Sequence, residues 1–525
     1  MKITIVNNHI KNLIGSMVTC DVYTNDKIFF CGIGGIGMSS LAITLRKFGF
    51  SSICGSDISH GYTIDNLLEN KISVNKDHRP ENIFNAKVII YSSAIDFEYN
   101  PEIVEARRQN IPIFHRNDLL QAIIKLYSIK IVVCGSHGKT TTTSMIGYML
   151  YQLGLKPTII VGGMIKNFQS NSVVCNDDDG KVCYDIVVVE SDESDGSFVN
   201  LDCEYSIFTS LSPEHLNYYG TFDNLIATKK MFYQNKVSKS SFYNINDQNI
   251  NQFMIPFGDN IEFYGSRSSI FSNRNENKNN SVCYQEYQFD KEKMSFIVNY
   301  QGNDHSVEMN IFGEHNVINA TGSIALINQL ILDAGNGKIE NLNQELISHI
   351  ERINFNEICK SISGFYGSRR RIDKIGTISN SIVYDDYGHH PREILTTLNA
   401  LRSAYINENI KFLAIFEPHR YSRIFNLFNE FAQTLSIVDK LLITPIYAAS
   451  EENIYGVSAF DLASKISSIN NKELNKDIFV LNNYEEILPI TRKIISEKTL
   501  EEQYIIVDFG AGKISMFMRG IVNSD

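Results

Sequence analysis

At 525 residues the chain is too long for one ordinary hydrophobic core, and its length predicts about three domains. Its 43% hydrophobic and 20% charged residues are typical of a soluble globular protein, and a formal net charge of −11 does not indicate a nucleic-acid partner. Nine scattered cysteines with neither a C-x-x-C pair nor a secretory signal predict buried, reduced thiols in a cytoplasmic protein. No apolar run approaches the roughly 18–20 residues of a membrane span.

The first predicted strand, Lys27–Cys31, leads into a glycine turn, GIGGIG at 32–37, and a predicted helix over 38–48. Asp57 follows the next short strand, about 20 residues beyond the turn, where a dinucleotide-binding fold places its ribose-binding acid. This chemistry requires only a diphosphate and a ribose hydroxyl. An NAD-type cofactor and a UDP group therefore fit the turn equally well.

A second glycine loop follows the apolar run 129–133 and precedes a predicted helix. Gly135 and Gly138 would let backbone N–H groups converge on phosphate oxygens, and the helix N-terminus adds positive potential. Lys139 can reach the β- and γ-phosphates, and Thr140 can hold Mg²⁺. The glycine spacing departs from the common G-x-x-x-x-G-K-[ST], but the order of strand, loop and helix predicts a nucleoside triphosphate site.

Two polar residues follow neighbouring strands of this region. Glu190 ends the apolar run 184–190, and His215 follows the next strand. Ligands of open parallel sheets gather at the carboxyl ends of strands, so Glu190 is the best-placed second carboxylate for a nucleotide-bound Mg²⁺. His215 is a weaker candidate, and Lys229 and Lys230 would by themselves be a solvated helix face.

Acidic, histidine and arginine side chains also follow two strands of the last region. The sequences are DDYGHHP at 385–391 and EPHRYSR at 417–423. Two strand ends of one domain that each deliver these residue types predict half of a site for an anionic substrate.

Short Val/Ile-rich runs alternate with helical patterns along the whole chain, which favours parallel sheets covered on both faces. The fold class is α/β, with three domains in series: a Rossmann-like domain, a central P-loop domain and a C-terminal Rossmann-like domain. The expected bounds are 1–125, with an unassigned leader at 1–26, then 126–360 and 361–525. An Asn- and Ser-rich stretch at 266–280 is expected to be an exposed loop of unknown role.

Taken together, these motifs resemble those of the Mur ligase family, from about residue 27 to residue 518. The phosphate loop, ESDESD at 190–195, GEHNVINA at 313–320, and the arginine- and histidine-rich motifs of the last region follow in the family's order. Phe312 and Arg369 depart from the usual Pro and Gly. The resemblance implies that this chain is a three-domain ligase. Its last domain would close over the central one, and its first domain would bind a UDP-sugar instead of NAD.

The motifs are most similar to those of the family member that uses ATP and Mg²⁺ to join L-alanine to the lactyl carboxylate of UDP-N-acetylmuramate in peptidoglycan precursor synthesis. This implies a cytoplasmic enzyme, monomeric or weakly dimeric, that makes an acyl phosphate. Three alternatives stay open: the sister ligase that attaches a recycled tripeptide, a non-catalytic nucleotide-binding relative, and an NAD-dependent oxidoreductase.

The resemblance also assigns roles to residues. The UDP-sugar would be bound by Gly32, Gly34, Gly35, Ile36, Gly37, Met38, Ser39, Asp57, His78, Ser92 and Ser93. ATP would be bound by Gly135, Ser136, His137, Gly138, Lys139, Thr140, Thr141, His315, Asn316, Asn319, Arg370 or Arg371, and Asp386. Mg²⁺ would be held by Thr140, Glu190 and His215, and by Lys229 or Lys230 if one of them is carbamoylated. Catalysis would use Lys139, His389, Arg420 and Arg423, the last three to orient alanine and the acyl phosphate.

Overall fold

A computed structural model describes residues 25–58, 61–254, 261–272, 281–290, 293–406, 409–449, 451–470, 474, 477–497 and 503–524. The leader at 1–26 therefore lies outside the described residues except for its last two. Of the predicted loop at 266–280, residues 273–280 also lie outside them. The rest of that prediction is wrong, because Arg267–Ser272 form helix α10. The hydroxyl of Ser266 accepts a hydrogen bond from the backbone N–H of Ser269 at 3.2 Å, which caps the new helix.

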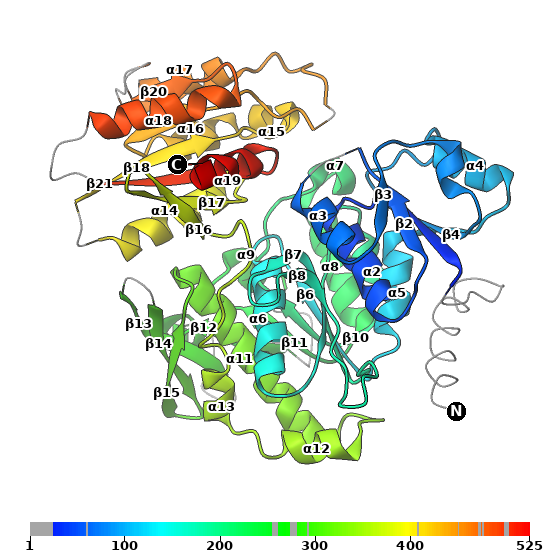
Figure 1. Cartoon of the computed structure of the whole chain (residues 1–525). Helices are drawn as coiled ribbons and strands as arrows, with labels where there is room; N and C mark the ends of the chain where they lie inside the picture. The colour runs from blue at the N-terminus through cyan, green and yellow to red at the C-terminus, as the bar shows by residue number, and fades with distance from the viewer. Residues whose placement is uncertain are drawn as a thin grey trace. The chain divides into compact units, whose positions relative to one another are not determined.

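The chain forms two compact units (Figure 1). Of the described residues, the first comprises those within 25–288, 293–311 and 315–367, and the second comprises those within 289–290, 312–314 and 368–524.

The first unit begins with a five-stranded parallel sheet in the order β3-β2-β1-β4-β5, drawn in blue in Figure 1. Phe29, Phe30 and Cys31 of the central strand are fully buried, as expected for a parallel sheet covered on both faces. The elements are β1 (Lys27–Cys31), α2 (Ile36–Lys47), β2 (Ile53–Ser56), α3 (Tyr62–Glu69), β3 (Ser73–Asn75), η1 (Pro80–Ile83), β4 (Ala86–Tyr91), α4 (Pro101–Arg108), β5 (Ile113–His115) and α5 (Arg116–Ile124).

The same unit continues with a ten-stranded sheet in the order β15-β14-β13-β12-β11-β10-β6-β9-β7-β8. Its central strands are parallel, whereas β7–β8 and β14–β15 pair antiparallel at the two edges. The strands are β6 (Ile129–Cys134), β7 (Thr158–Ile165), β8 (Ser170–Val173), β9 (Ile186–Glu190), β10 (Cys203–Phe208), β11 (Val237–Asn244), β12 (Ile261–Ser266), β13 (Val282–Asp290), β14 (Lys293–Tyr300) and β15 (Asn303–Met309). The helices are α6 (Lys139–Gln152), η2 (Ser197–Asn200), α7 (Leu216–Tyr219), α8 (Phe222–Lys236), α9 (Gln248–Phe253), α10, α11 (Glu314–Gly335), α12 (Gln344–Ile350) and α13 (Phe355–Lys360).

Helix α2 joins these two sheets. The hydroxyls of Thr44 on α2 and Ser172 on β8 lie 2.7 Å apart, and the amide of Asn171 donates to the backbone carbonyl of Ile36 at 3.0 Å. The glycine turn before α2 is therefore held in a defined position relative to the second sheet.

Helix α11 is, by length and composition alone, the one described helix that could cross a membrane. Its most apolar window is 83% buried inside the fold, which is typical of a core helix in a globular domain. Among the described helices, α11 is therefore the one exception to the prediction that no apolar run approaches the length of a membrane span.

The second unit is built on a six-stranded sheet in the order β16-β17-β21-β18-β19-β20, drawn in yellow to red in Figure 1. Only β16 pairs antiparallel. Its elements are β16 (Asp373–Ile378), β17 (Ser381–Asp386), α14 (Pro391–Ala404), β18 (Ile410–Phe416), α15 (Tyr421–Asn426), α16 (Phe428–Leu435), β19 (Lys440–Ile443), α17 (Ala459–Asn470), β20 (Ile478–Val480), η4 (Tyr484–Glu486), α18 (Ile487–Ser496), β21 (Gln503–Phe509) and α19 (Ile514–Ser524).

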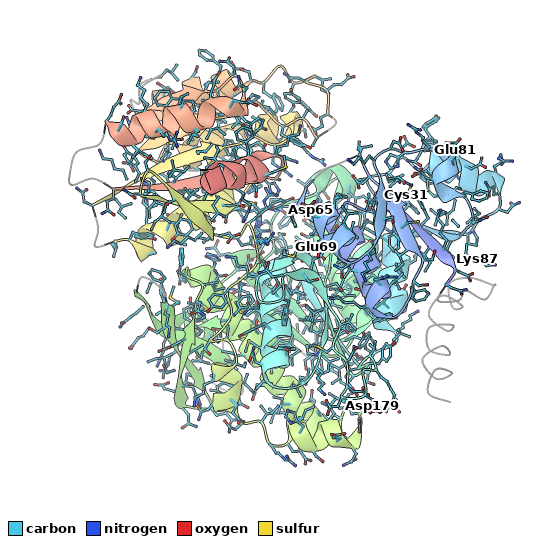
Figure 2. All side chains as sticks on the ribbon, viewed as in Figure 1. Cys31, Asp65, Glu69, Glu81, Lys87 and Asp179 are labelled. Carbon is cyan, nitrogen blue, oxygen red and sulfur yellow. The ribbon has the colours of Figure 1, made fainter. Side chains whose placement is uncertain are left out.

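The described cysteines are free thiols and most of them are buried, as the sequence predicts. Cys31, labelled in Figure 2, ends β1 in the first sheet. Burial raises the pKa of Cys134 to about 12, and it raises the pKa of Cys31 further, with the Glu102 carboxylate adding to the effect. Such thiols stay protonated near neutral pH, so they behave as core residues and not as nucleophiles.

Candidate functional site

The phosphate loop lies between β6 and α6, and its two glycines are required by geometry. Gly135 and Gly138 have φ angles of +134° and +82°, which side chains rarely adopt. A Cβ on Gly135 would overlap the side chain of Thr209. Helix α6 begins at Lys139 directly after Gly138, so the first backbone N–H groups of the helix would favour an anion in the loop.

Lys139 is folded onto this loop. Its Nζ donates hydrogen bonds to the carbonyls of Gly135 at 2.5 Å and Ser136 at 2.9 Å, and lies 3.8 Å from a Glu193 carboxylate oxygen. Burial alone would lower the pKa of Lys139, but attraction from Glu193 and Glu214 outweighs it and raises the pKa. The side chain therefore remains a cation, as contact with a triphosphate requires.

Glu190 faces the phosphate loop, as its position at the end of β9 predicts. One carboxylate oxygen accepts a hydrogen bond from the Thr140 hydroxyl at 2.9 Å, and the other accepts from the backbone N–H of Gly162 at 2.6 Å. A Cβ on Gly162 would lie only 2.8 Å from this carboxylate. A hydroxyl and a carboxylate side by side are ligands that Mg²⁺ prefers.

A second group of candidate metal ligands lies nearby in the sequence but has different members from those predicted. The ligand atoms of Glu193, Glu214 and His215 all lie within 4.8 Å of one another. His215 adopts a left-handed backbone conformation with φ 55°. Sequence reasoning named His215 but missed Glu193 and Glu214, although one belongs to the acidic run after β9 and the other precedes His215 directly.

The structure distinguishes Lys229 from Lys230. The Lys229 side chain is 1% exposed and forms an ion pair with Glu193, which is 2% exposed, whereas Lys230 is partly exposed. Burial alone would raise the pKa of Glu193, but attraction from Lys229 and Lys139 lowers it below the usual value. Lys229 thus lies at the group formed by Glu193, Glu214 and His215, through its ion pair with Glu193.

The start of α11 borders the phosphate loop, as the GEHNVINA motif predicts. The side-chain oxygen of Asn319 lies 3.2 Å from the position that a Cβ on Gly138 would occupy. The amide of Asn319 donates to the side chain of Asn316 at 3.4 Å, and His315 precedes this pair on the first turn. The polar side chains at the start of α11 therefore lie beside the loop in which a nucleotide would bind.

The glycine turn after β1 has a partner in Asp57. The backbone N–H of Gly34 donates to the Asp57 carboxylate at 2.8 Å. Ser39, predicted to contact the UDP-sugar, is buried; its backbone N–H donates to the Gly35 carbonyl at 2.8 Å, and its hydroxyl accepts from Asn171 at 2.9 Å. Ser39 thus holds α2 against the second sheet.

His78 and Ser93 are held by acidic residues that sequence reasoning did not assign to this site. His78 Nδ1 lies 2.9 Å from a carboxylate oxygen of the buried Glu102. The Ser93 hydroxyl donates to Asp195 at 2.5 Å and lies 2.9 Å from Nε2 of His115. Ser93 therefore faces the acidic run that follows β9 and begins at Glu190.

In the second unit, Asp386 ends β17 and anchors the backbone around it. Its carboxylate accepts hydrogen bonds from the N–H groups of Ile372 and Gly388, both at 2.8 Å. Burial raises the pKa of Asp386 to about 6, although the charge of Arg371 opposes the shift. Arg370 is buried and donates to the Gly510 carbonyl at 2.5 Å, so its guanidinium is engaged within the unit.

Two of the predicted anion-binding residues of this unit lie beside His419, which belongs to the motif at 417–423 but was given no role of its own. The His389 and His419 rings lie 5.9 Å apart, and Nη1 of Arg423 lies 3.1 Å from Nδ1 of His419. Arg420 precedes α15 with φ 70°. Burial, and after it repulsion from His389 and Arg423, lowers the pKa of His419 to about 3, so this ring is neutral beside the Arg423 guanidinium.

Glu417, the acid of the same strand end, has a structural role. It is fully buried, and its carboxylate accepts from the backbone N–H groups of Gly512, Lys513 and Ile514 at 2.7–3.1 Å. Its charge therefore caps α19 instead of facing a substrate. The prediction that both strand ends offer an acid to a ligand is wrong at this one.

Three family models match successive parts of the chain: the catalytic domain of the Mur ligase family at residues 27–128, the Mur ligase middle domain at 133–327, and the Mur ligase glutamate ligase domain at 370–510. They confirm the predicted series of three α/β domains. The chain is 35% identical to the UDP-N-acetylmuramate–L-alanine ligase of Aquifex aeolicus over 492 residues, which cover 93% of this chain and 95% of that one.

Two solved structures share the fold. The UDP-N-acetylmuramate-alanine ligase of Thermotoga maritima superimposes with a TM-score of 0.72 at 24% identity, covering 95% of this chain and 98% of that one. A murein peptide ligase of Psychrobacter arcticus gives 0.62 at 19% identity, again covering 95% and 98%.

Proposed function

This chain belongs to the Mur ligase family, and we propose that it joins L-alanine to the lactyl carboxylate of UDP-N-acetylmuramate with conversion of ATP to ADP and phosphate. The observation that carries the proposal is the full-length similarity to an L-alanine ligase at 35% identity. The glycine turn after β1 and the phosphate loop after β6 support it, because they offer two anion sites on one unit. One suits a UDP diphosphate and the other suits ATP.

The chemistry follows from the difficulty of forming an amide in water. A carboxylate oxygen of the UDP-sugar would attack the γ-phosphorus of ATP, ADP would leave, and an acyl phosphate would form. The alanine amine would then attack the acyl carbon, lose a proton, and expel phosphate. Lys139, held as a cation at the loop, would neutralise charge that develops on the transferred phosphoryl group.

Mg²⁺ is part of the proposal. Thr140 and Glu190 present oxygen ligands beside the phosphate loop, and Glu193, Glu214 and His215 form the second group of ligands. The ion would supply charge neutralisation on the phosphate oxygens. Lys229 is now a cation paired with Glu193, and carbamoylation would turn it into an anion. A metal cation bound between the carbamate and the Glu193 carboxylate would then have to replace the present ion pair.

The remaining assignments are proposals of the same kind. Asp57, His78, Ser92 and Ser93 would contact the UDP-sugar, and Asn316 and Asn319 the nucleotide. In the second unit, the engaged guanidinium of Arg370 favours Arg371 as the nucleotide contact, with His389, Arg420 and Arg423 for alanine and the acyl phosphate. We also propose domain bounds near residues 126 and 361, a cytoplasmic location, and a monomer or weak homodimer.

Phosphate release tests the proposal directly. The full chain is incubated with ATP, Mg²⁺ and UDP-N-acetylmuramate, and either L-alanine or L-Ala-γ-D-Glu-diaminopimelate is added. Release that depends on L-alanine is expected. Release only with the tripeptide would identify a recycling ligase of the same fold, and no release with either would mark a non-catalytic relative.

A further inference from the structure

Arg116 begins α5, and its guanidinium lies against the glycine turn of the first sheet. If Gly37 carried a Cβ, that atom would lie 3.1 Å from Nη1 of Arg116. Gly37 is in the first turn of α2, where the backbone N–H groups of the turn and the helix N-terminus favour an anion. The side chain of Arg116 is 16% exposed. A cationic side chain thus lies beside the turn to which the diphosphate of the substrate is assigned.

The other side of the guanidinium faces the acidic run after β9. Nη2 of Arg116 lies 2.6 Å from the Asp192 carboxylate and 3.4 Å from that of Asp195. Burial alone would lower the pKa of Arg116, but the two carboxylates raise it. Nε is also buried, and among the residues that the structure describes none accepts a hydrogen bond from it. The ion pairs therefore leave a buried donor of this side chain unused.

The two acids do not cancel the site's attraction for an anion. Asp192 is 47% exposed, so water screens its charge. Asp195 accepts hydrogen bonds from the hydroxyls of Ser93 and Ser197 and from the backbone N–H of Ser197, which spread its charge over several donors. Both acids then serve to orient the guanidinium, whose planar donors match phosphate oxygens.

The position of Arg116 also suits the reaction. The run that holds Asp192 and Asp195 begins at Glu190, whose carboxylate accepts a hydrogen bond from Thr140 at the phosphate loop. A substrate with its diphosphate at the glycine turn and its carboxylate near the γ-phosphate has to extend from one loop to the other. Arg116 lies against α2, which follows the glycine turn, and pairs with the acidic run after β9, whose first residue is hydrogen-bonded to Thr140.

We propose that Arg116 is a substrate-binding residue that donates hydrogen bonds to the diphosphate of the UDP-sugar, with Asp192 and Asp195 as positioning residues. The inference rests on the proposed function for the identity of the ligand. It names a contact that the sequence motifs do not indicate, since an arginine at the start of a helix is ordinarily a solvated residue.

Binding of substrate fragments tests this contact without turnover. Dissociation constants are measured by titration calorimetry for UDP-N-acetylmuramate, UDP-N-acetylglucosamine, UDP and uridine with the full chain and with Arg116→Gln and Arg116→Lys. Loss of a charge-assisted contact is expected to weaken all three UDP ligands about 10- to 100-fold in Arg116→Gln, with a smaller loss in Arg116→Lys. Uridine, which lacks phosphate, should bind each variant equally.

Two further variants serve as controls. Arg108→Gln makes the same chemical change at an exposed surface pair with Glu105, and should leave every dissociation constant unchanged. Asp192→Asn removes a carboxylate that orients Arg116 but leaves the guanidinium charged. This variant should therefore weaken UDP binding less than Arg116→Gln does. Thermal unfolding of each variant separates a binding loss from a folding loss, and Arg116→Lys retains a measurable binding signal if Arg116→Gln does not fold.

The outcomes are distinct. Unchanged UDP affinity in folded Arg116→Gln or Arg116→Lys would overturn the proposal and leave Arg116 as a bridge between the sheets. A loss confined to UDP-N-acetylmuramate would also overturn it, since the contact would then be to the lactyl carboxylate. The expected loss of UDP affinity in a protein that releases no phosphate would support the Arg116 contact while refuting the ligase function.

Discussion

The buried ion pair between Lys229 and Glu193 makes a strong prediction about stability. Their side chains are 1% and 2% exposed, so replacing Lys229 by Met leaves a carboxylate with little access to water. Removing one partner of such a pair typically costs about 3–5 kcal/mol. Lys139 lies 3.8 Å from the other carboxylate oxygen and offers partial compensation, so we expect the lower end, about 3 kcal/mol.

The free energy of unfolding is measured by urea unfolding. The signal that is recorded has to report on the first unit alone, because a multidomain chain need not unfold in one step. Lys230→Met is the matched control on the same helix, and as a partly exposed position it should change stability by no more than about 0.5 kcal/mol. Replacing both partners, Lys229→Met with Glu193→Leu, should recover most of the loss because no unpaired charge remains.

Acid provides an independent check on the same pair. The folded state lowers the pKa of Glu193 from its usual 4.5, so the stabilisation by the pair is present above that pH and is lost as the pH falls through the lowered value. The difference between the wild type and Lys229→Met should shrink over the same range. A cost below about 1 kcal/mol at pH 7, or no recovery in the double variant, would refute the reasoning.

Three further predictions concern the candidate site. Lys139→Ala should abolish phosphate release while calorimetry finds UDP-N-acetylmuramate binding nearly unchanged; a loss of that binding would contradict the separation of the two anion sites. Gly162→Ala should displace the Glu190 carboxylate, lower kcat by about 10- to 100-fold and raise the Mg²⁺ concentration needed for half-maximal rate, whereas normal kinetics would exclude a role for this carboxylate. Because the folded state lowers the pKa of His419, the unfolded state takes up a proton first as the pH falls below 6.5, and the free energy of unfolding should fall with the pH. His419→Gln should flatten this pH dependence of the urea midpoint, measured from pH 7 to 4.5. An unchanged pH dependence in the variant would contradict the assigned shift.

Strands were predicted best where the chain is buried on both faces. The run at 27–31 coincides with β1, the run at 129–133 lies within β6, and the run at 184–190 contains β9. Continuous Val/Ile runs are a strong local signal of a parallel strand. The antiparallel edge strands escaped notice because β15, for example, is polar and largely exposed, so no apolar period marks it.

The candidate site divides along a similar line. Local motifs indicated the phosphate loop, Glu190 at a strand end, and His389 with its arginines, because each follows directly from the sequence around it. Glu193 and Glu214 were missed because the sequence alone does not show which acidic side chains the fold brings together with His215. Glu417 was wrongly predicted to face a ligand, because the three backbone N–H groups that it accepts from come from the start of α19, which is distant in the sequence.

The sequence by itself determined the α/β class, the two glycine turns and the family, because these depend on short-range patterns of apolar residues, glycines and motif order. Tertiary structure alone decided which charges meet. Lys229 pairs with Glu193, and Arg116 reaches from α5 to both the turn at Gly37 and the acid at Asp192. Those contacts join segments tens of residues apart, and a side chain's partner across such a separation is fixed by sheet order and helix packing, which no local pattern encodes.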